Sequence, residues 1–274
     1  MNKKVIYSCC VGGYDHILQP LAIDETFDYI CFSNDMAADS KIGVWTILPI
    51  PFECSNLTIL SRYPKLLPHK LLPEYDYSVY IDANIQILNK EFYDVINSKI
   101  ASGCLVSHVR HSVPPIDCIY EEISYAYKFN KVSFWDGWRQ AMYLKGMGFP
   151  RHYGLYENNL IGRFHNNEKV MELSIQWWNE FVNHSPRDQF SLMYVYWKNH
   201  FTPECLFKDE KICTRNSSMV KYHQHALESS NIGTITLKTR IAWRLHRMSY
   251  YVLRAMIWCA LEIERVKRSS KENQ

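Results

Sequence analysis

The chain has 274 residues, of which 47% are hydrophobic and 22% are charged. This balance excludes a disordered, collagen-like or low-complexity protein, and the length allows one large domain or two small ones. The net charge of +3 is unevenly spread, because the segment from Lys238 onward holds nine basic and three acidic residues, which leaves 22 basic and 25 acidic residues before it. By charge, the main body is therefore not a nucleic-acid-binding surface.

The first half of the chain alternates short apolar runs with helical patterns. The runs at 5–11, 27–32, 44–48, 77–81 and 103–107 predict strands, and 57–72 predicts a helix interrupted by prolines. The second half predicts helices over 132–145, 167–183 and from Ser185-Pro186 to about Lys198, with an extended segment over 153–164. This order indicates an α/β fold with a mostly parallel sheet flanked by helices.

The cysteines and the apolar runs indicate the class of protein. The nine cysteines form no C-x-x-C pair, and Cys9 and Cys10 are adjacent in an apolar run. This usage predicts reduced, buried thiols in an intracellular protein. The first apolar stretch ends at Gly12-Gly13, too early for a signal peptide, and no run is long enough for a membrane-spanning helix.

Polar groups follow three of the predicted strands, at Gly12 to Asp15, Ser33 to Asp35 and Asp82 to Asn84. Ligands bind beyond the carboxyl ends of parallel strands, so we expect a site there. The oxygen-bearing side chains of Asp82 and Asn84, two residues apart, can face one divalent cation that bridges a diphosphate. The alternative is an Asx turn that caps the strand.

A cationic segment precedes this strand. Arg62, Lys65 and His69 have the spacing i, i+3, i+7, which places them near one helix face that can meet a phosphate. The alternative is a solvated helix surface. Further along, His223 and His225 form an H-x-H pair, and an imidazole can complete the coordination that Asp82 begins.

Two later segments have the chemistry of sugar binding. The segment from Tyr153 to Asn159 mixes aromatic, acidic and amide groups, although a polar edge strand with a bulge at Gly154 is the alternative. The spacing of Ser185 and Asp188 favours a capping box. The functional alternative places Asp188 at a helix N-terminus facing a sugar.

Together these motifs resemble a glycosyltransferase-like family of formerly unknown function, whose members occur in bacterial surface-polysaccharide clusters and among plant mucilage-related proteins. The resemblance runs from Val5 to His225, through the segments 62–70, 74–84, 153–159 and 187–191. It implies a GT-A-type fold, a nucleotide-sugar donor and a divalent cation, Mn²⁺ or Mg²⁺. The implied acceptor is a glycan or lipid-linked glycan in surface polysaccharide or lipopolysaccharide synthesis.

The resemblance also implies roles for particular residues. The pair Asp188-Gln189 resembles the Asp-Gln motif of retaining GT-A families, so we expect the transfer to retain configuration. Donor-binding residues are Gly13, Tyr14, Asp15, Asn34, Asp35, Arg62, Lys65, His69, Asp82, Ala83 and Asn84. Acceptor-binding residues are His108, Arg110, Tyr153, Gly154, Glu157 and Asn158, catalytic residues are Arg187, Asp188 and Gln189, and metal ligands are Asp82, Asn84 and His223.

Two other functions remain open from the sequence. One is a nucleotidyl- or phosphotransferase on a similar sheet, and the other is a non-catalytic carbohydrate-binding protein that has lost its metal through Asn84. Each lacks one component that a glycosyltransferase needs: the first has no sugar platform, and the second has no nucleotide-sugar affinity.

The C-terminal segment predicts a basic amphipathic helix. We expect a catalytic domain over 1–232 and this helical segment over 233–270. On a helical wheel one stripe is apolar and the next face is basic with flanking aromatics, which suits an anionic membrane surface on the cytoplasmic side. Alternatively, the stripe packs on the catalytic domain or in a homodimer. The basic residues are Arg240, Arg244, Arg247, Arg254 and Arg265, and the apolar stripe is Ile241, Leu245, Met248, Val252, Met256, Cys259 and Ile263. Trp243, Tyr250, Tyr251 and Trp258 lie on or beside the basic face.

Overall fold

A computed structural model describes residues 3–111, 117–185, 187–225 and 237–272 of the chain. Within these residues the core is a sheet with the strand order β3-β4-β2-β1-β5-β8-β7-β9. Strands β1 (Lys4–Cys9), β2 (Phe27–Phe32), β4 (Trp45–Leu48) and β5 (Tyr77–Ile81) are mutually parallel. β8 (Tyr156–Arg163) runs antiparallel between β5 and β7 (Val106–Arg110), and the short strands β3 (Lys41–Ile42) and β9 (Glu204–Cys205) lie at the edges.

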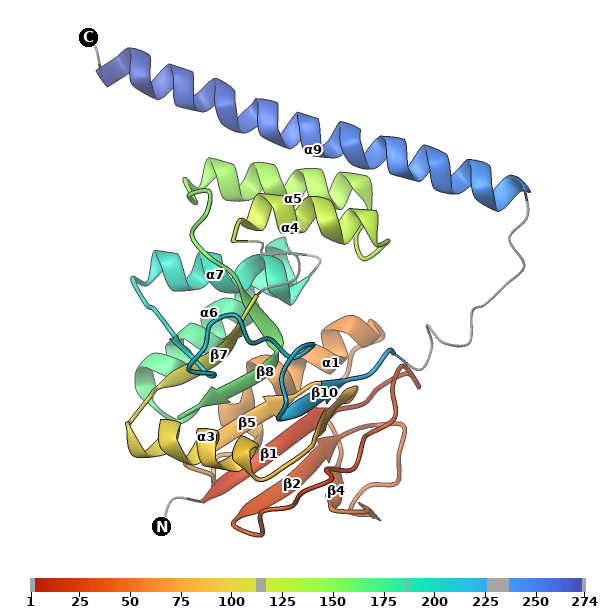
Figure 1. The fold of residues 1–274 in the computed structure, drawn as a ribbon, viewed down its shortest axis with the longest axis vertical. Helices are drawn as coiled ribbons and strands as arrows, with labels where there is room; N and C mark the ends of the chain where they lie inside the picture. Colours follow the sequence, from red (N-terminus) through yellow and green to blue (C-terminus); the bar gives the residue numbers. More distant parts are fainter. Residues whose placement is uncertain (1–2, 112–116, 186, 226–236, 273–274) are drawn as a thin grey trace.

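Helices cover both faces of the sheet, which confirms the predicted α/β class (Figure 1). All five residues of β5 are buried, as expected for a strand that is covered on both faces. In β1, Val5 and Tyr7 belong to one core cluster, and Ile6 belongs to the other. The second cluster includes Phe92 and Ile96 of helix α3 (Glu91–Ala101), while the other helices contribute to the first.

The predicted helix over 57–72 is two helices, α1 (Leu57–Leu66) and α2 (Pro68–Leu71). The Asn56 side chain caps α1 by accepting hydrogen bonds from the amides of Thr58 and Ile59, at 2.9 and 3.2 Å. Helices α5 (Phe134–Gly146) and α6 (Glu168–His184) lie where the apolar spacing predicts them. The sequence reasoning missed α3, α4 (Ile119–Lys128) and the small two-stranded antiparallel sheet of β6 (Ile85–Ile87) and β10 (Val220–Tyr222).

Three local predictions are wrong. Strand β7 begins at Val106, because Gly103 adopts a positive φ of 71° and turns the chain. Helix α7 (Asp188–Lys198) begins at Asp188, and the Ser185 hydroxyl donates to the carbonyl of Arg187 at 2.6 Å, so no capping box forms. β8 is an interior strand, and its pairing with β7 shifts between Glu157 and Ile161 instead of bulging at Gly154.

The C-terminal helix α9 (Leu237–Glu272) lies across α4 and α5 (Figure 1). Its side chains are described over 243–263, where Tyr250, Leu253 and Ile257 are buried against the body. The Tyr127 and Ser249 hydroxyls hydrogen-bond at 2.5 Å, and Arg151 pairs with Glu262 at 2.7 Å. Of the helices in the described chain, none is long and apolar enough to cross a membrane, and all nine cysteines are free.

Candidate functional site

The site is built around Asp82, which follows the carboxyl end of β5. Its side chain is one-third exposed, and the Tyr80 hydroxyl donates to Asp82 Oδ1 at 2.7 Å. Burial and the nearby Asp82 charge raise the pKa of Tyr80 well above its ordinary value, so the phenol stays protonated. The Asp82 amide donates to the carbonyl of Asn159 at 2.8 Å, which ties the end of β5 to the irregular part of β8.

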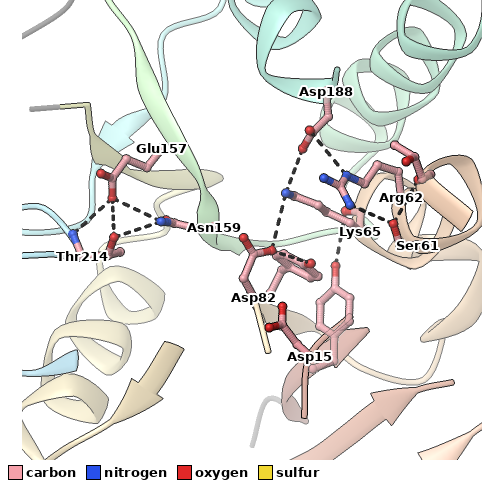
Figure 2. A network of polar contacts seen from close by, with 12 residues as sticks. Asp15, Ser61, Arg62, Lys65, Asp82, Glu157, Asn159, Asp188 and Thr214 are labelled. Atoms are coloured by element: carbon pink, nitrogen blue, oxygen red, sulfur yellow. Dashed lines mark hydrogen bonds and ion pairs between the residues drawn. The ribbon is translucent and has the colours of Figure 1, made fainter. Parts of the chain in front are cut away.

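Two cations of α1 meet a buried carboxylate from α7. Lys65 Nζ lies 2.8 Å from Asp188 Oδ2 and 3.7 Å from Asp82 Oδ1, and Arg62 Nε lies 3.5 Å from Asp188 Oδ1. Figure 2 shows Lys65 between the two carboxylates and Arg62 beside Asp188. The spacing i, i+3 therefore brings Arg62 and Lys65 to one place, as predicted.

Asp188 is held in its ionised form. Burial acts to raise the pKa of its carboxyl, but the charges of Lys65 and Arg62 outweigh burial and hold that pKa far below its usual range. Only 6% of the side chain is exposed. Its position in the first turn of α7 adds the favourable helix dipole. The site thus presents a fixed negative charge beside two cations.

A buried arginine of β8 supports this arrangement. Arg163 donates hydrogen bonds to the Tyr7 hydroxyl at 2.7 Å and to the backbone carbonyl of Lys65. It therefore fixes the last turn of α1, from which the Lys65 side chain extends. Sequence reasoning missed Arg163, which follows the apolar run Leu160-Ile161 and Gly162 at the end of β8 and is buried there.

The segments after β1 and β2 form the wall of a pocket of about 270 Å³. The Gly13 amide donates to Asp35 Oδ2 at 3.3 Å, and Asp15 Oδ2 lies 2.8 Å from His225 Nδ1. The Tyr14 ring lies 4.7 Å from the His225 ring. The pocket is lined by Cys10, Gly13, Asp15, His16, Ile17, Asp35, Met36 and Ile42. The structure thus brings Gly13, Asp15 and Asp35 together as the sequence predicted.

Asn34 and Ala83 take structural positions near this wall. The Asn34 side chain accepts a hydrogen bond from the Ile50 amide at 2.8 Å. Ala83 is only 4% exposed. The Asn34 carbonyl oxygen is therefore already hydrogen-bonded within the protein, and the Ala83 side chain has little exposed surface for contact with a donor.

The predicted metal ligands are only partly arranged for a cation. The Asn84 amide group donates to the His223 carbonyl at 2.8 Å, while its buried Oδ1 has no hydrogen-bond partner among the described residues. The His223 Nε2 lies 3.2 Å from Gln86 Oε1. In the described chain no three His, Cys, Asp or Glu side chains are grouped to hold a metal. The oxygens of Asp82 and Asn84 fit a hard cation, and the His223 ring is turned to Gln86.

The predicted acceptor residues gather around the start of β8. The Arg110 guanidinium lies 5.3 Å from the centre of the Tyr156 ring, and Gly154, with φ of 95°, leaves room beside it. A Cβ on Gly154 would lie 3.7 Å from that guanidinium. Tyr153 is 38% exposed. Asn158 is buried, and neither polar atom of its amide has a partner among the described residues.

Glu157 forms a separate network on the other side of β8. Its Oε2 accepts hydrogen bonds from the Thr214 amide and hydroxyl at 3.1 and 2.7 Å (Figure 2). Burial raises the pKa of Glu157, and the Thr214 hydrogen bonds partly oppose this shift. Asn159 also donates to Thr214 at 2.9 Å. This network anchors the segment after β9 to the site.

Two predicted histidines do not face the site. His108 is fully buried, and its Nε2 lies 2.8 Å from the Tyr196 hydroxyl, which argues against contact with an acceptor. His69 does not join Arg62 and Lys65, because α1 ends at Leu66, with Leu67 as its C-cap, and α2 starts a new helical register. Burial, with the nearby Arg163 charge, lowers the pKa of His69 to about 4, so this ring is neutral near pH 7.

The other two predicted catalytic residues flank Asp188. Gln189 is buried and donates to the Tyr156 carbonyl at 2.8 Å, so it connects α7 to β8. The Arg187 guanidinium lies 5.6 Å from the Phe190 ring centre. Burial lowers the pKa of Arg187, and the Glu122 charge opposes this effect. Neither residue contacts the Asp82–Lys65 pair directly in the described hydrogen bonds.

The chain is similar to a known glycosyltransferase-like family and to a solved glycosyltransferase structure. The model of the TOD1/MUCI70 glycosyltransferase-like domain matches residues 1–225, in agreement with the resemblance seen in the sequence. No curated protein matches significantly. Among solved structures, the bifunctional glycosyltransferase WbbM in its apo form is 12% identical, with a TM-score of 0.42. That match covers 75% of this chain and 39% of the WbbM chain.

Proposed function

Because the chain belongs to the TOD1/MUCI70 glycosyltransferase-like family, we propose that it transfers a sugar from a nucleotide-sugar donor to a glycan or lipid-linked glycan. The observation that carries this proposal is the cluster of Asp82, Lys65, Arg62 and Asp188 at the carboxyl end of β5. Such a cluster combines charges for a diphosphate with a carboxylate for a reacting sugar.

The charges suggest how this chain would assist the reaction. Departure of a nucleoside diphosphate builds negative charge on its β-phosphate, which Arg62 and Lys65 can stabilise. The anomeric carbon becomes positive as the bond to the leaving group breaks, and the ionised Asp188 can stabilise that charge. An acceptor held on the same side of the sugar as the leaving group would give the retaining outcome that the Asp188-Gln189 pair suggests.

A divalent cation remains part of the proposal. Asp82, with the unpartnered Oδ1 of Asn84, would hold Mn²⁺ or Mg²⁺, and the cation would neutralise the diphosphate. His223 would contribute its Nδ1, since its Nε2 lies within hydrogen-bond distance of Gln86 Oε1. Because a carboxylate binds a divalent cation more strongly than an uncharged amide does, we expect Asp82→Ala to lower turnover far more than Asn84→Ala does.

The acceptor is proposed to lie at the start of β8. Tyr153 offers an exposed ring for stacking on a sugar face. The buried amide of Asn158, which has no partner among the described residues, would reach an acceptor hydroxyl only after a local rearrangement. Arg110, which faces Tyr156 and Gly154, can bind an acidic or phosphorylated group. The pocket of Asp15 and Asp35 is proposed to take the nucleoside.

A screen of nucleotide sugars and plain nucleotides tests the proposal. Binding to the folded state raises the melting temperature, and a ligand at about 100 times its Kd stabilises by about 2.7 kcal/mol. We expect stabilisation by one nucleotide sugar and its slow hydrolysis, both reduced in Asp82→Ala. The Lys41→Ala variant, changed at an exposed lysine of β3, is the matched control.

Other outcomes would replace the proposal. Turnover of plain nucleotides without any sugar requirement would identify a nucleotidyl- or phosphotransferase. Glycan binding without affinity for any nucleotide sugar would identify a carbohydrate-binding protein. Full activity in a strong chelator would remove the cation from the mechanism while leaving the transferase intact.

A further inference from the structure

Helix α9 carries an apolar stripe on its outer surface. Leu245, Met248, Val252 and Ile263 are 60%, 65%, 52% and 57% exposed, and Cys259 is exposed as well. At about 100° per residue these five side chains fall within about 60° of arc. Scattered exposed apolar residues are ordinary, but a continuous stripe of this kind is typical of a surface that binds a protein or a membrane.

The stripe is not the face by which α9 packs on the body. The buried residues Tyr250, Leu253 and Ile257 centre on a direction about 130° away from it. The alternative that the stripe packs on the catalytic domain is therefore wrong within the described residues, although the helix itself packs there through another face. Tyr250, which the sequence placed beside the basic face, also lies inside, where its ring contacts Tyr125.

Polar contacts hold the helix in this orientation. His246 Nε2 lies 3.1 Å from the Tyr127 carbonyl, and Arg151 pairs with Glu262 at the other end of the described part. Turning the stripe inward would break both contacts and expose Leu253. The body thus presents the stripe outward on a fixed helix.

A basic and aromatic face lies beside the stripe. Arg244, Arg247 and Arg254 project within about 40° of one direction, and Arg247 lies 6.0 Å from the Trp243 ring centre. Trp243, Tyr251 and Trp258 are 65%, 53% and 54% exposed on or near this face. Arginines and amphipathic aromatic rings next to an apolar stripe are typical of helices that lie in the headgroup layer of a bilayer.

A pocket of about 270 Å³ opens between this face and α4. Arg254, Tyr251 and Trp258 form its α9 side, together with Ala255, Ile257 and Leu261, and Arg151 lies at its edge. Most of the lining side chains are apolar or aromatic, and the charged ones are two arginines and Glu121 of α4. Such a lining can accept part of an acyl chain while an arginine binds the phosphate above it.

We propose that α9 docks this protein on a membrane surface rich in anionic phospholipids, with the stripe inserted among acyl chains and the arginine face on lipid phosphates. The charge favours this occupant over a second copy of the chain. An antiparallel two-fold pair of α9 helices joined by the stripes would bring like-charged arginine faces to the same side, and Glu262 is already paired with Arg151. The segment from Lys238 onward has a net charge of +6, which an anionic surface attracts.

Vesicle flotation of the full chain tests the proposal. The probes are vesicles of phosphatidylcholine alone and of phosphatidylcholine with phosphatidylglycerol, at about 0.05 and about 0.5 M salt. We expect binding to the anionic vesicles at low salt and loss of binding at high salt. Each arginine near an anionic surface contributes about fivefold in affinity, so Arg244→Glu/Arg247→Glu should weaken binding by about 25-fold or more.

Matched variants separate the stripe from general surface properties. Met248→Ser/Val252→Ser should lose most binding, whereas Ile175→Ser/Val182→Ser, at exposed apolar positions of α6, should keep it. The charge control is Lys41→Glu/Lys208→Glu, at exposed lysines of the body. Circular dichroism and melting temperatures establish that all four variants fold, since every substituted side chain is exposed.

The opposite results would overturn the proposal. Equal flotation with neutral and anionic vesicles, or equal binding by the stripe variant and its control, excludes this surface. No flotation, with a dimer in sedimentation velocity that Met248→Ser/Val252→Ser converts to monomer, assigns the stripe to a second copy. Donor and acceptor are absent from every arm, so the result is independent of the glycosyltransferase proposal.

Discussion

Asp188 combines a structural ion pair with a proposed role at the sugar. Lys65 is 3% exposed and depends on this carboxylate at 2.8 Å, with Asp82 as a more distant partner. Removing one partner of a buried ion pair costs several kcal/mol, so we expect Asp188→Asn to lose about 2–4 kcal/mol of unfolding free energy. Arg62 is the more distant partner of Asp188, because its Nε lies 3.5 Å from Asp188 Oδ1. Urea unfolding measures this loss, and turnover should fall by about a hundredfold or more.

A second substitution separates the two roles of Asp188. Lys65→Met removes the buried charge that Asp188→Asn leaves unpaired, so the double variant should be more stable than the two single losses predict. Turnover should stay lost, because the carboxylate proposed for the sugar and the lysine proposed for the diphosphate are both missing. Recovery of turnover in the double variant would reduce Asp188 to a partner of Lys65.

At the residue scale, the sequence predicted which groups gather but not which atoms meet. Asp82, Arg62 and Lys65 were predictable because a strand end and an i, i+3 spacing are local patterns. The Asp188–Lys65 pair joins residues far apart in the chain, and spacing alone favoured a cap for Asp188. His69 was misplaced because a single helical wheel was continued past Leu67, where the helix ends. The partners of His223 depend on the antiparallel pairing of β6 with β10, which no pattern in the sequence indicated.

At the scale of elements, neighbouring residues of α9 should respond in opposite ways. Leu253 is fully buried, and Val252 is 52% exposed. Leu253→Ala should lower the unfolding free energy by about 2–5 kcal/mol, because it opens a cavity against α4 and α5. Val252→Ala should change it by less than about 0.5 kcal/mol. Urea unfolding of both variants measures the difference, and equal effects would mean that α9 does not pack as described.

The same pair shows why the helix was predictable and its orientation was not. The periodicity of residues 237–272 predicts a helix with an apolar stripe, and the stripe exists. Packing, however, uses Tyr250, Leu253 and Ile257, with hydrogen bonds from His246 and Ser249 to α4. An aromatic ring and small polar groups can satisfy an interface as well as a stripe of aliphatic residues does. The alternative that the aliphatic stripe packs on the catalytic domain is therefore wrong, and no pattern in the sequence indicated the face that does pack.

At the scale of the whole molecule, alternation of strands and helices was enough for the fold class. A sheet covered on both faces requires continuous apolar runs such as Tyr77–Ile81, and these are visible in the sequence. The insertion of β8 between β5 and β7 was not predictable, since direction and order of strands depend on tertiary pairing. That insertion is what brings Asn158 and Asn159 to the end of β5.

Buried histidines should make the stability of the whole chain depend on pH. Burial lowers the pKa of His108 to about 3 and that of His165 to about 4, and both side chains are 0% exposed. In the unfolded chain each ring titrates near 6.5, so between about pH 4 and 6.5 the unfolded state binds more protons than the folded state. Stability therefore falls as the pH is lowered through this window and is fully present above it.

The size of this fall follows from the two rings. Each should contribute about 1.5 kcal/mol between pH 6.5 and 5, and His69 and His111, whose pKa values burial also lowers to about 4, add to the fall, so the unfolding free energy should drop by at least about 3 kcal/mol over that range. Urea unfolding at both pH values measures the drop. His165→Gln should reduce the drop by about 1.5 kcal/mol. The variant loses stability at both pH values unless the glutamine amide reaches the Leu72 carbonyl and replaces the imidazole as its hydrogen-bond donor. His200→Asn, at an exposed position after α7, is the control and should leave the drop unchanged. A stability that is constant from pH 6.5 to 5 would mean that the folded chain protonates these rings as readily as the unfolded chain does, and it would contradict the prediction.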